Sequence, residues 1–594
     1  MTEATASRFE PETQPASEKI HYYVAMPQPE NHLFEVSLHL RNYCAEYLNL
    51  KLPVWTPGSY LVREYARHLQ NFTAWTGDKC LEWHKVSKNY WQVKIDTSEE
   101  VLIRYQIFAN ELTVRTNHLD ATHGYFNGAA IFFRIPELDK QEIYVTVKPP
   151  KDDWKIATGL KTVPEQSNTF LAADYDTLVD SPFEIGTHQL HHFQVMEKPH
   201  ELAIWGQGNY QTQQMIADIK KVIQVEAKIF DGLPYERYLF LLHLSPKASG
   251  GLEHKNSTSL IYQRFGFRDR SKYERFMQLV AHEFFHLWNV KRIRPKALEV
   301  FDYDQENYTP SLWFCEGTTS YYDLIIPFRA GIYDAKVYLE NLSKEITRYE
   351  TTPGRKVQPV DESSFDAWIK LYRQDANSPN FQISYYLKGE LVSLLLDLMI
   401  RSRHQNQRSL DDVMVKMWEQ FGKEEIGYTP QQLQTVIESV AGIELEDFFN
   451  SYVRSTENLP FNKYLEPFGL QLVGNIPEEP YLGLKVKSDA GKDKIKFVET
   501  DSPAHRAGID PGDELLAING VRVSALQLKD RLGDYQPGDT IQVTVFHQDL
   551  LRNYSVTLEQ PASTQYSLQP IQNPTPQQQE NFIGWLGTSI EDIQ

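Results

Sequence analysis

This chain of 594 residues has little cysteine, no long apolar run and no excess of positive charge. Its three cysteines, Cys44, Cys80 and Cys315, are scattered and odd in number, so no disulfide framework is expected. The net charge of −19 argues against nucleic acid as a partner, because nucleic-acid binding needs a basic face. The apolar run at 391–400 is too short to span a membrane. Residues 1–17 are polar and lack the apolar core of a signal peptide, so the cytoplasm is the expected location.

The sequence does contain an HExxH motif, HEFFH at 282–286. The surrounding run, 273–290, lacks Gly and Pro and has apolar residues every three to four positions, which predicts a helix. Ser271, with Glu274 three residues later, predicts a capping box at its start. Histidines four apart on a helix share a face, so both imidazoles can bind one metal ion. Glu283 can take a proton from a water molecule whose pKa zinc lowers to roughly 7.

A third protein ligand is expected, because catalytic zinc usually has three and leaves a fourth position open. No further histidine follows in the HExxHxxGxxH register, so three glutamates compete: Glu299, Glu306 and Glu316. Glu316 lies in an aromatic-rich segment that predicts a buried helix, whereas Glu306 lies in a polar loop. A buried carboxylate is costly unless it is paired or binds metal, so Glu316 is the predicted ligand. Cys315 points about 100° away around the helix and is predicted to be a core thiol.

The segment GGLEH at 250–254 follows an apolar run, 238–244, that predicts a strand. Gly250 and Gly251 would let a substrate backbone approach closely, and a strand edge can pair with an extended peptide. Glu253 could then meet the free α-ammonium group of that peptide. Taken alone, the same residues are typical of a glycine turn with a solvated glutamate.

The segment YYLKG at 385–389 opens a strongly apolar predicted helix. A tyrosine hydroxyl near the metal could stabilise the oxyanion that forms when water adds to a peptide carbonyl, and such a donor contributes about 3 kcal/mol. Packing is the alternative role for a tyrosine pair at a helix start.

Composition and periodicity divide the chain into five parts. Residues 1–18 are expected to be disordered, and alternating segments such as 34–40 predict a β-rich, sandwich-like domain over 19–190. A small sheet followed by helices is predicted over 191–470. A separate unit spans 475–560, and 561–594 is expected to be a Pro- and Gln-rich linker and tail whose apolar patch could dock onto the body.

Together HEFFH, the later Trp-x-x-Glu-Gly, GGLEH and YLKG resemble gluzincin metallopeptidases of the aminopeptidase type. More narrowly, LPVWTPGSY at 52–60, NVKRIRP at 289–295 and the late unit resemble the glycyl aminopeptidase family with a PDZ domain. The resemblance covers nearly the whole chain after about residue 18. It implies a multidomain α+β fold: an N-terminal β-sandwich-like domain, a thermolysin-like, mainly helical catalytic domain with a small sheet, and a C-terminal PDZ domain.

The resemblance also implies roles for individual residues. One zinc ion per chain would be bound by His282, His286 and Glu316, with Glu283 as general base. Tyr386 would be the oxyanion donor, and its rival is Tyr385. Glu253 would anchor the substrate amino terminus, although His254 stands where the better-known aminopeptidase pattern has Asn.

In the late unit, YLGL at 481–484 resembles the carboxylate-binding loop of PDZ domains, with Leu482, Gly483 and Leu484 in that loop. Successive backbone N–H groups there could hold a peptide C-terminus. Simple packing on the peptidase is the alternative role for this domain.

The expected function is that of a zinc aminopeptidase acting on peptides with a free N-terminus. A preference for glycine or alanine as the first residue is implied by the resemblance alone. The alternatives are a zinc endopeptidase that the PDZ domain guides to unfolded or damaged proteins, and a non-catalytic peptide-binding scaffold.

Overall fold

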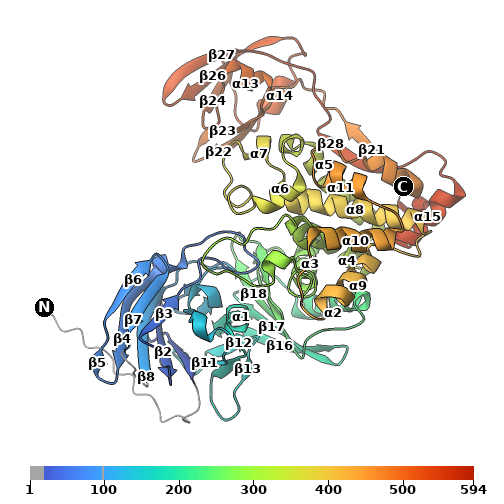
Figure 1. The fold of residues 1–594 in the computed structure, drawn as a ribbon. Helices are drawn as coiled ribbons and strands as arrows, with labels where there is room; N and C mark the ends of the chain where they lie inside the picture. Colours follow the sequence, from blue (N-terminus) through green and yellow to red (C-terminus); the bar gives the residue numbers. More distant parts are fainter. Residues whose placement is uncertain (1–18, 44, 96–99, 594) are drawn as a thin grey trace.

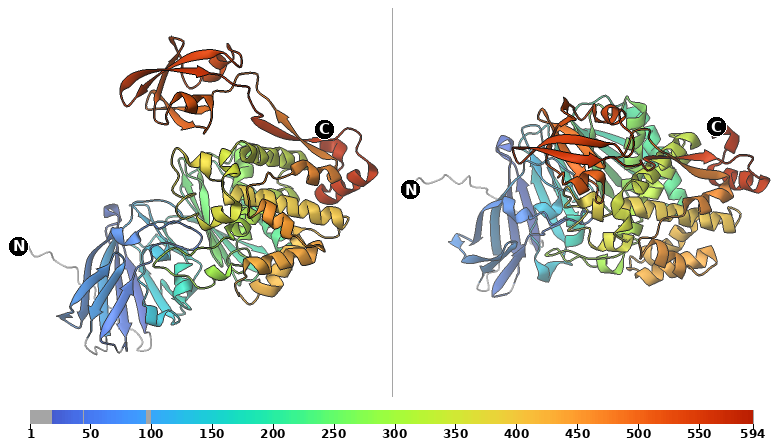
Figure 2. Two further views of the ribbon diagram at one scale, coloured as in Figure 1. Left: turned by 45° about the horizontal axis from the view of Figure 1, so that its top comes forward. Right: turned by 90° about the horizontal axis from the view of Figure 1, so that it is seen from above.

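The computed structural model describes residues 19–43, 45–95 and 100–593. An N-terminal β region lies at one end of the molecule, a helical region beside it, and a C-terminal β domain above them (Figures 1 and 2). This mixed α+β architecture agrees with the expected fold class. The expected disorder of residues 1–18 lies outside the described residues. Among the helices that are described, none combines the length and apolar character needed to cross a membrane.

The N-terminal region is built from three sheets, whose strand orders are β13-β14-β11-β1-β2-β8-β4-β5, β12-β15-β10-β9 and β3-β7-β6. Strand β2 shows why these segments form sheets, since alternate residues along it are buried. The elements are β1 (Ile20–Ala25), β2 (Leu33–Arg41), β3 (Tyr47–Lys51), β4 (Leu69–Thr76), β5 (Lys79–Cys80), β6 (Trp83–Ser87), β7 (Tyr90–Lys94), β8 (Glu100–Phe108), β9 (His118–Leu119), β10 (His123–Phe126), β11 (Ile143–Lys148), β12 (Lys155–Thr158), β13 (Lys161–Thr162), β14 (Thr169–Ala172), α1 (Tyr175–Val179) and β15 (Phe183–Gly186).

A five-stranded sheet joins this region to the helices, in the order β16-β17-β18-β20-β19. Its strands are β16 (Gln189–Val195), β17 (Lys198–Trp205), β18 (Tyr238–Ser245), β19 (Gly250–Glu253) and β20 (Ser257–Gln263). Strand β18 is buried on both faces. Phe240 and Leu242 pack into the core of the helical region, whereas Leu239 and Leu241 pack with Tyr125 of β10. Strand β18 therefore separates two environments, and β19 lies at the edge of the sheet.

Helices form the rest of the central region. They are α2 (Thr212–Ile229), α3 (Arg270–Phe285), α4 (Thr318–Arg329), α5 (Ala335–Glu350), α6 (Val360–Phe365), α7 (Ser378–Phe381), α8 (Tyr385–Arg403), α9 (Leu410–Met417), α10 (Pro430–Ala441), α11 (Glu446–Tyr452) and α12 (Phe461–Leu465).

Helix α3 differs from the expectation at both ends. Its N-cap is Asp269, which accepts a hydrogen bond from the backbone N–H of Lys272, so the predicted Ser271 cap is wrong by two residues. The helix ends at Phe285 rather than near residue 290, because the chain turns tightly there and the N–H of Leu287 bonds to the carbonyl of Phe284.

The C-terminal β domain has a core of its own and comprises β22 (Leu484–Asp489), β23 (Lys492–Val498), α13 (Pro503–Ala507), β24 (Glu514–Ile518), β25 (Val521–Arg522), α14 (Leu528–Leu532), β26 (Thr540–His547) and β27 (Leu550–Thr557). It touches the helical region at α7, where the side-chain amide of Asn380 donates to the carbonyl of Val498 and its oxygen accepts from the N–H of Thr500.

Part of the segment expected to be a linker is ordered structure instead. Strand β28 (Gln565–Pro570) pairs antiparallel with β21 (Leu470–Asn475), so the chain returns from the β domain to the helical region. Helix α15 (Pro576–Leu586) then packs near α8 and buries Phe582, Trp585 and Leu586 in the central core. The apolar patch therefore docks onto the body as expected, with α15 beside the end of α8 (Figure 1).

The packing of α15 gives a first testable prediction. Phe582 is fully buried, whereas its neighbour Ile583 is about half exposed. Phe582→Ala should lower the free energy of unfolding of the central region by about 3–5 kcal/mol, since it leaves a cavity in the core. Ile583→Ala should change it by no more than about 0.5 kcal/mol. Calorimetric unfolding of the two full-length variants checks this, and equal effects would show that α15 is not part of the core.

Candidate metal centre and active site

Helix α3 brings the two histidines of the HEFFH segment together. His282 lies in the last turn of the helix and His286 is its C-cap residue. Their ring centroids are 4.7 Å apart and the rings are nearly perpendicular. The spacing of four residues places both rings on one side of the helix end, as the sequence predicted.

Glu316 completes this cluster. Its Oε2 atom lies 3.4 Å from Nε2 of His282 and 3.1 Å from Nε2 of His286. All three ligand-type atoms lie within 4.8 Å of one another, the arrangement expected of groups that could hold one metal ion. Glu316 lies in a π-helical turn, Trp313–Gly317, that runs directly into α4. Such turns often occur at functional sites.

Each imidazole is oriented through its other nitrogen. Nδ1 of His282 lies 2.7 Å from Oδ2 of Asp323, and Nδ1 of His286 lies 2.6 Å from the carbonyl oxygen of Asn289. An Nδ1–H that donates to these oxygens leaves an Nε2 lone pair pointing at Glu316. Two lone pairs and a carboxylate facing one another repel unless positive charge lies between them, supplied either by protons on the imidazoles or by a metal ion. The donor set therefore fits a bound metal ion.

Burial and the neighbouring charged groups shift the pKa values of His282 and Glu316 in opposite directions. Burial alone would lower the pKa of His282, but its hydrogen bonds to Asp323 and Glu316 outweigh burial and raise it. Burial alone would raise the pKa of Glu316, yet the charge of His286 and the hydrogen bonds from both histidines hold it below its usual range. Glu316 is therefore kept ionised, as a metal ligand must be.

Glu283 lies beside the cluster and is only 5% exposed. Burial raises the pKa of its carboxyl group, against the opposing effect of His282 and His286. Its Oε2 has no hydrogen-bond partner among the described residues, so one carboxylate oxygen is free to accept a proton. Gly251 of β19 lies against this carboxylate, and a Cβ at that position would come 2.3 Å from Cδ of Glu283. Only glycine fits there.

Glu253, the last residue of β19, lies on the same side of the sheet edge. Its carboxylate groups with Glu283 and His286, with ligand-type atoms within 4.8 Å. Oε1 of Glu253 is buried and lacks a protein partner within the described ranges. Gly250, by contrast, has open space where a side chain would point, whereas the space at Gly251 is filled by Glu283.

The N-terminal region also reaches this site. Gly58 has a φ of +84°, and a Cβ there would lie 2.4 Å from Oε1 of Glu253. Arg115, which precedes β9, donates from Nη2 to the carbonyl oxygen of Gly251 at 3.0 Å. No local pattern in the sequence indicated Arg115, because the contact joins residues 136 positions apart.

Three tyrosines form a chain of hydroxyl groups near the histidines. The Tyr372 hydroxyl lies 2.9 Å from that of Tyr386 and 2.9 Å from that of Tyr385. The ring of Tyr386 stacks toward His282 at a centroid distance of 6.2 Å. Tyr385 is fully buried, and Tyr386 is partly exposed. Tyr372 was not predicted; it lies outside helices and strands and carried no motif.

The other candidates for the third metal ligand, Glu299 and Glu306, do not lie in the cluster of His282, His286 and Glu316. Glu299 binds Nζ of Lys296 and the N–H of Gly427, and neither Glu299 nor Glu306 belongs to a metal-type cluster among the described residues. The thiol of Cys315 is buried and lies 3.6 Å from the hydroxyl of Tyr428, which agrees with a core thiol.

His254 points away from the metal-type cluster. Its Nδ1 lies 3.2 Å from Oδ1 of Asp180, which Lys291 also contacts at 2.6 Å. The residue that departs from the aminopeptidase pattern therefore connects β19 to the N-terminal region instead of to the cluster.

In the C-terminal β domain, the predicted carboxylate loop precedes an edge strand. Leu482 is buried, Gly483 has a φ of +83°, and Leu484 begins β22. Strand β22 is the terminal strand of its sheet, so one of its edges is available for pairing with a peptide.

A helix with His-Glu-x-x-His, joined by a glutamate from the next helical segment, defines a metallopeptidase of the gluzincin class. Sequence models of known families agree: the Peptidase M61 N-terminal domain matches residues 21–187, M61 glycyl aminopeptidase matches 275–392, and a PDZ domain matches 480–558. No curated protein sequence matches the chain.

Among solved structures, an aminopeptidase N family protein from Idiomarina loihiensis is 32% identical, with a TM-score of 0.90. The match covers 96% of this chain and 100% of that one. An M1 zinc metallopeptidase from Deinococcus radiodurans is 13% identical over 75% of this chain and 94% of its own, with a TM-score of 0.48, too distant to support an argument. This chain belongs to the M61 glycyl aminopeptidase family, a family of gluzincin peptidases, and carries a PDZ domain.

The contact of Asp323 with His282 gives a second prediction. Asp323→Asn keeps the shape but removes the negative charge behind the imidazole, so metal affinity should fall about 10–100-fold. Competition between the protein and a chelator of known affinity measures this. Glu340→Gln, at an exposed position of α5, is the control and should leave the affinity unchanged. An unaltered affinity in Asp323→Asn would mean that this carboxylate does not orient a ligand.

Proposed function

We propose that the protein is a zinc aminopeptidase that removes N-terminal residues from peptides. The observation that supports this most directly is the placement of two buried carboxylates, Glu283 and Glu253, beside the cluster of His282, His286 and Glu316. One carboxylate suits proton transfer and the other suits a cationic amino terminus, and both face one metal-type centre.

His282, His286 and Glu316 would hold one catalytic zinc ion, a metal that imidazole and carboxylate ligands suit. Bound there, zinc supplies Lewis-acid activation of water and of the peptide carbonyl. Asp323 and Asn289 hold the two imidazoles in the orientation that binding requires.

Glu283 is the proposed general base. Its free Oε2 takes the proton of the attacking water and later passes it to the leaving amine, whose C–N bond breaks. Because Glu283 is buried and lies next to two histidines, its unpartnered Oε2 is the proposed site of proton transfer.

Glu253 is the proposed anchor for the α-ammonium group. Its unpaired, buried Oε1 is costly unless a cation or donor meets it, and the substrate amino terminus supplies both. Because Glu253 lies close to Glu283 and His286, the anchored ammonium group would be about one residue from the reacting carbonyl. That spacing favours an aminopeptidase over an endopeptidase.

Tyr386 is the proposed oxyanion donor, since its ring stacks near His282 and its side chain is partly exposed. Tyr372 would position it through the hydroxyl contact at 2.9 Å. Full burial of the Tyr385 ring argues against Tyr385 in this role. A preference for glycine or alanine rests on the family resemblance alone.

The general-base proposal predicts that Glu283→Gln keeps its metal but loses activity. The amide cannot accept the proton, so kcat should fall by at least about 10²–10⁴-fold on aminoacyl reporters. Metal content by mass spectrometry should equal that of the wild type. Glu274→Gln, on the same helix and paired with Arg270, is the control and should keep normal turnover. Retained activity in Glu283→Gln would remove this mechanism.

The anchor proposal predicts a dependence on the free amine. An alanyl reporter should be hydrolysed, and its N-acetylated form should not. Glu253→Ala should lose activity on the free amine selectively, with a rise in KM, because the ammonium group loses its partner. Cleavage of the acetylated peptide at a comparable rate would instead support the PDZ-guided endopeptidase. A wild type that binds zinc but hydrolyses neither would support the scaffold.

A further inference from the structure

A second group of imidazoles surrounds a buried carboxylate, Glu184. Nδ1 of His123 lies 3.0 Å from Oε1 of Glu184, and Nε2 of His243 lies 2.9 Å from Oε2. Nδ1 of His188 lies 3.8 Å from Oε1. The ligand-type atoms of His123, Glu184 and His243 lie within 4.8 Å of one another.

This group lies on the opposite face of β18 from the proposed active site. His243 has the same parity along the strand as Leu239 and Leu241, which face the N-terminal region. Glu184 comes from β15 and His123 from β10, two paired strands of the N-terminal region. The group therefore joins two sheets that belong to different regions of the chain.

All four side chains are at most 2% exposed. Both ring nitrogens of His188, Nε2 of His123 and Nδ1 of His243 have no hydrogen-bond partner in the described part of the protein. Burying polar atoms without partners is costly, so such a concentration of them needs an explanation. The explanation must account above all for His188, which has no partner at either nitrogen.

The surroundings favour a cation. Glu184 is only 2% exposed, and each of its carboxylate oxygens faces an imidazole nitrogen, so a cation among these groups would compensate a buried negative charge. The indole ring of Trp205 stacks on His123 at 3.6 Å and helps to exclude solvent.

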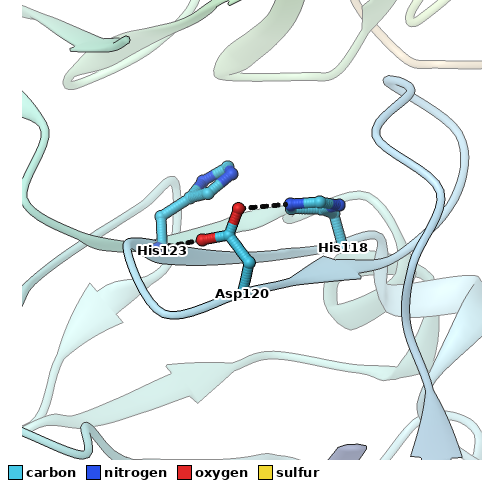
Figure 3. A group of neighbouring side chains, drawn as sticks. All are labelled: His118, Asp120 and His123. Carbon is cyan, nitrogen blue, oxygen red and sulfur yellow. Dashed lines mark hydrogen bonds and ion pairs between the residues drawn. The ribbon is translucent and has the colours of Figure 1, made fainter. Parts of the chain in front are cut away.

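A fourth histidine and a second carboxylate adjoin the group through His123. Figure 3 shows Asp120 between His118 and His123, with Oδ2 at 3.1 Å from Nε2 of His118 and Oδ1 accepting from the backbone N–H of His123 at 3.1 Å. These bonds fix the turn from which β10 begins, and with it the position of the His123 ring.

We propose that His123, Glu184 and His243 bind a second divalent metal ion of the zinc class, with His188 as a fourth ligand once its ring turns toward the ion. Tetrahedral ligands at about 2.0–2.1 Å from zinc lie roughly 3.3 Å from one another. The contacts of His123 and His243 with Glu184, at 3.0 and 2.9 Å, are close to that spacing, and His188, at 3.8 Å from Glu184 and outside the group within 4.8 Å, has to move closer. Four buried protein ligands leave no open position, so this site is structural and holds β10 and β15 against β18.

A hydrogen-bonded network without metal explains the two short contacts of Glu184. It does not explain why His188 lies within 4 Å of the same carboxylate, too far for a hydrogen bond, with neither nitrogen paired. A metal ion held by the other three side chains gives His188 a partner when the His188 ring moves toward it.

Metal stoichiometry separates the two explanations. Purified wild-type protein should carry two metal ions per chain by mass spectrometry. The double variant His282→Ala/His286→Ala, which lacks the proposed catalytic site, should keep one. Adding Glu184→Gln to that background should remove it. Adding His200→Gln instead should not, since His200 is equally buried but bonds to Tyr235 and to the carbonyl of Lys198.

One metal ion in the wild type and none in the double variant would overturn the proposal. A test that needs no substitution in the group follows the melting temperature of the double variant, which should rise with added zinc and fall with chelator. Anomalous diffraction at the zinc edge from wild-type crystals should give a peak among His123, Glu184 and His243. Absence of that peak, with one at His282 and His286, would leave only the hydrogen-bonded network.

Discussion

The Glu316 carboxylate lies between the Nε2 atoms of His282 and His286, and the surrounding helices are arranged around this contact. A buried charge of this kind persists only where its partners are fixed. Asp323 orients one imidazole from α4, and Asn289 orients the other from the turn after α3. The amide of Asn289 also donates to the carbonyls of Phe314 and Cys315, which ties the same turn to the segment that carries Glu316. The helix, the turn and the π-helical segment thus form one unit, and the position of Glu283 follows from it.

The N-terminal region is part of the proposed active site as well as a separate fold. Gly58 lies against the Glu253 carboxylate, and Arg115 holds the backbone of β19. The five-stranded sheet has groups of histidine and carboxylate on both faces: one at the end of α3 and the other around Glu184. If the second group binds metal as proposed, the sheet edge that receives a peptide is supported from behind by a rigid junction between the two regions.

The C-terminal β domain is inserted between two paired strands, β21 and β28, so both of its ends connect to the helical region (Figure 2). Asn380 of α7 adds a third point of attachment. This arrangement fixes the edge strand β22 relative to the peptidase more firmly than a single linker could. The burial of Phe582 and Trp585 anchors the returning chain, which explains why the tail carries apolar residues at helical spacing.

The sequence determined the elements whose chemistry is local. The four-residue spacing of His282 and His286 required a shared helix face, and the cost of burying Glu316 in an aromatic segment identified it among three glutamates. The apolar run at 238–244 also located β18, and the resemblance of YLGL at 481–484 to a PDZ carboxylate loop located the PDZ domain. The tertiary structure decided which residues far apart in the sequence come into contact. Arg115, Tyr372, Gly58 and the group around Glu184 come from loops and strands far apart in the chain, and no periodic pattern encodes which side chains meet when sheets pack. Asp323 falls between these cases: it is seven residues after Glu316, two helical turns on the same face, so spacing could have revealed it.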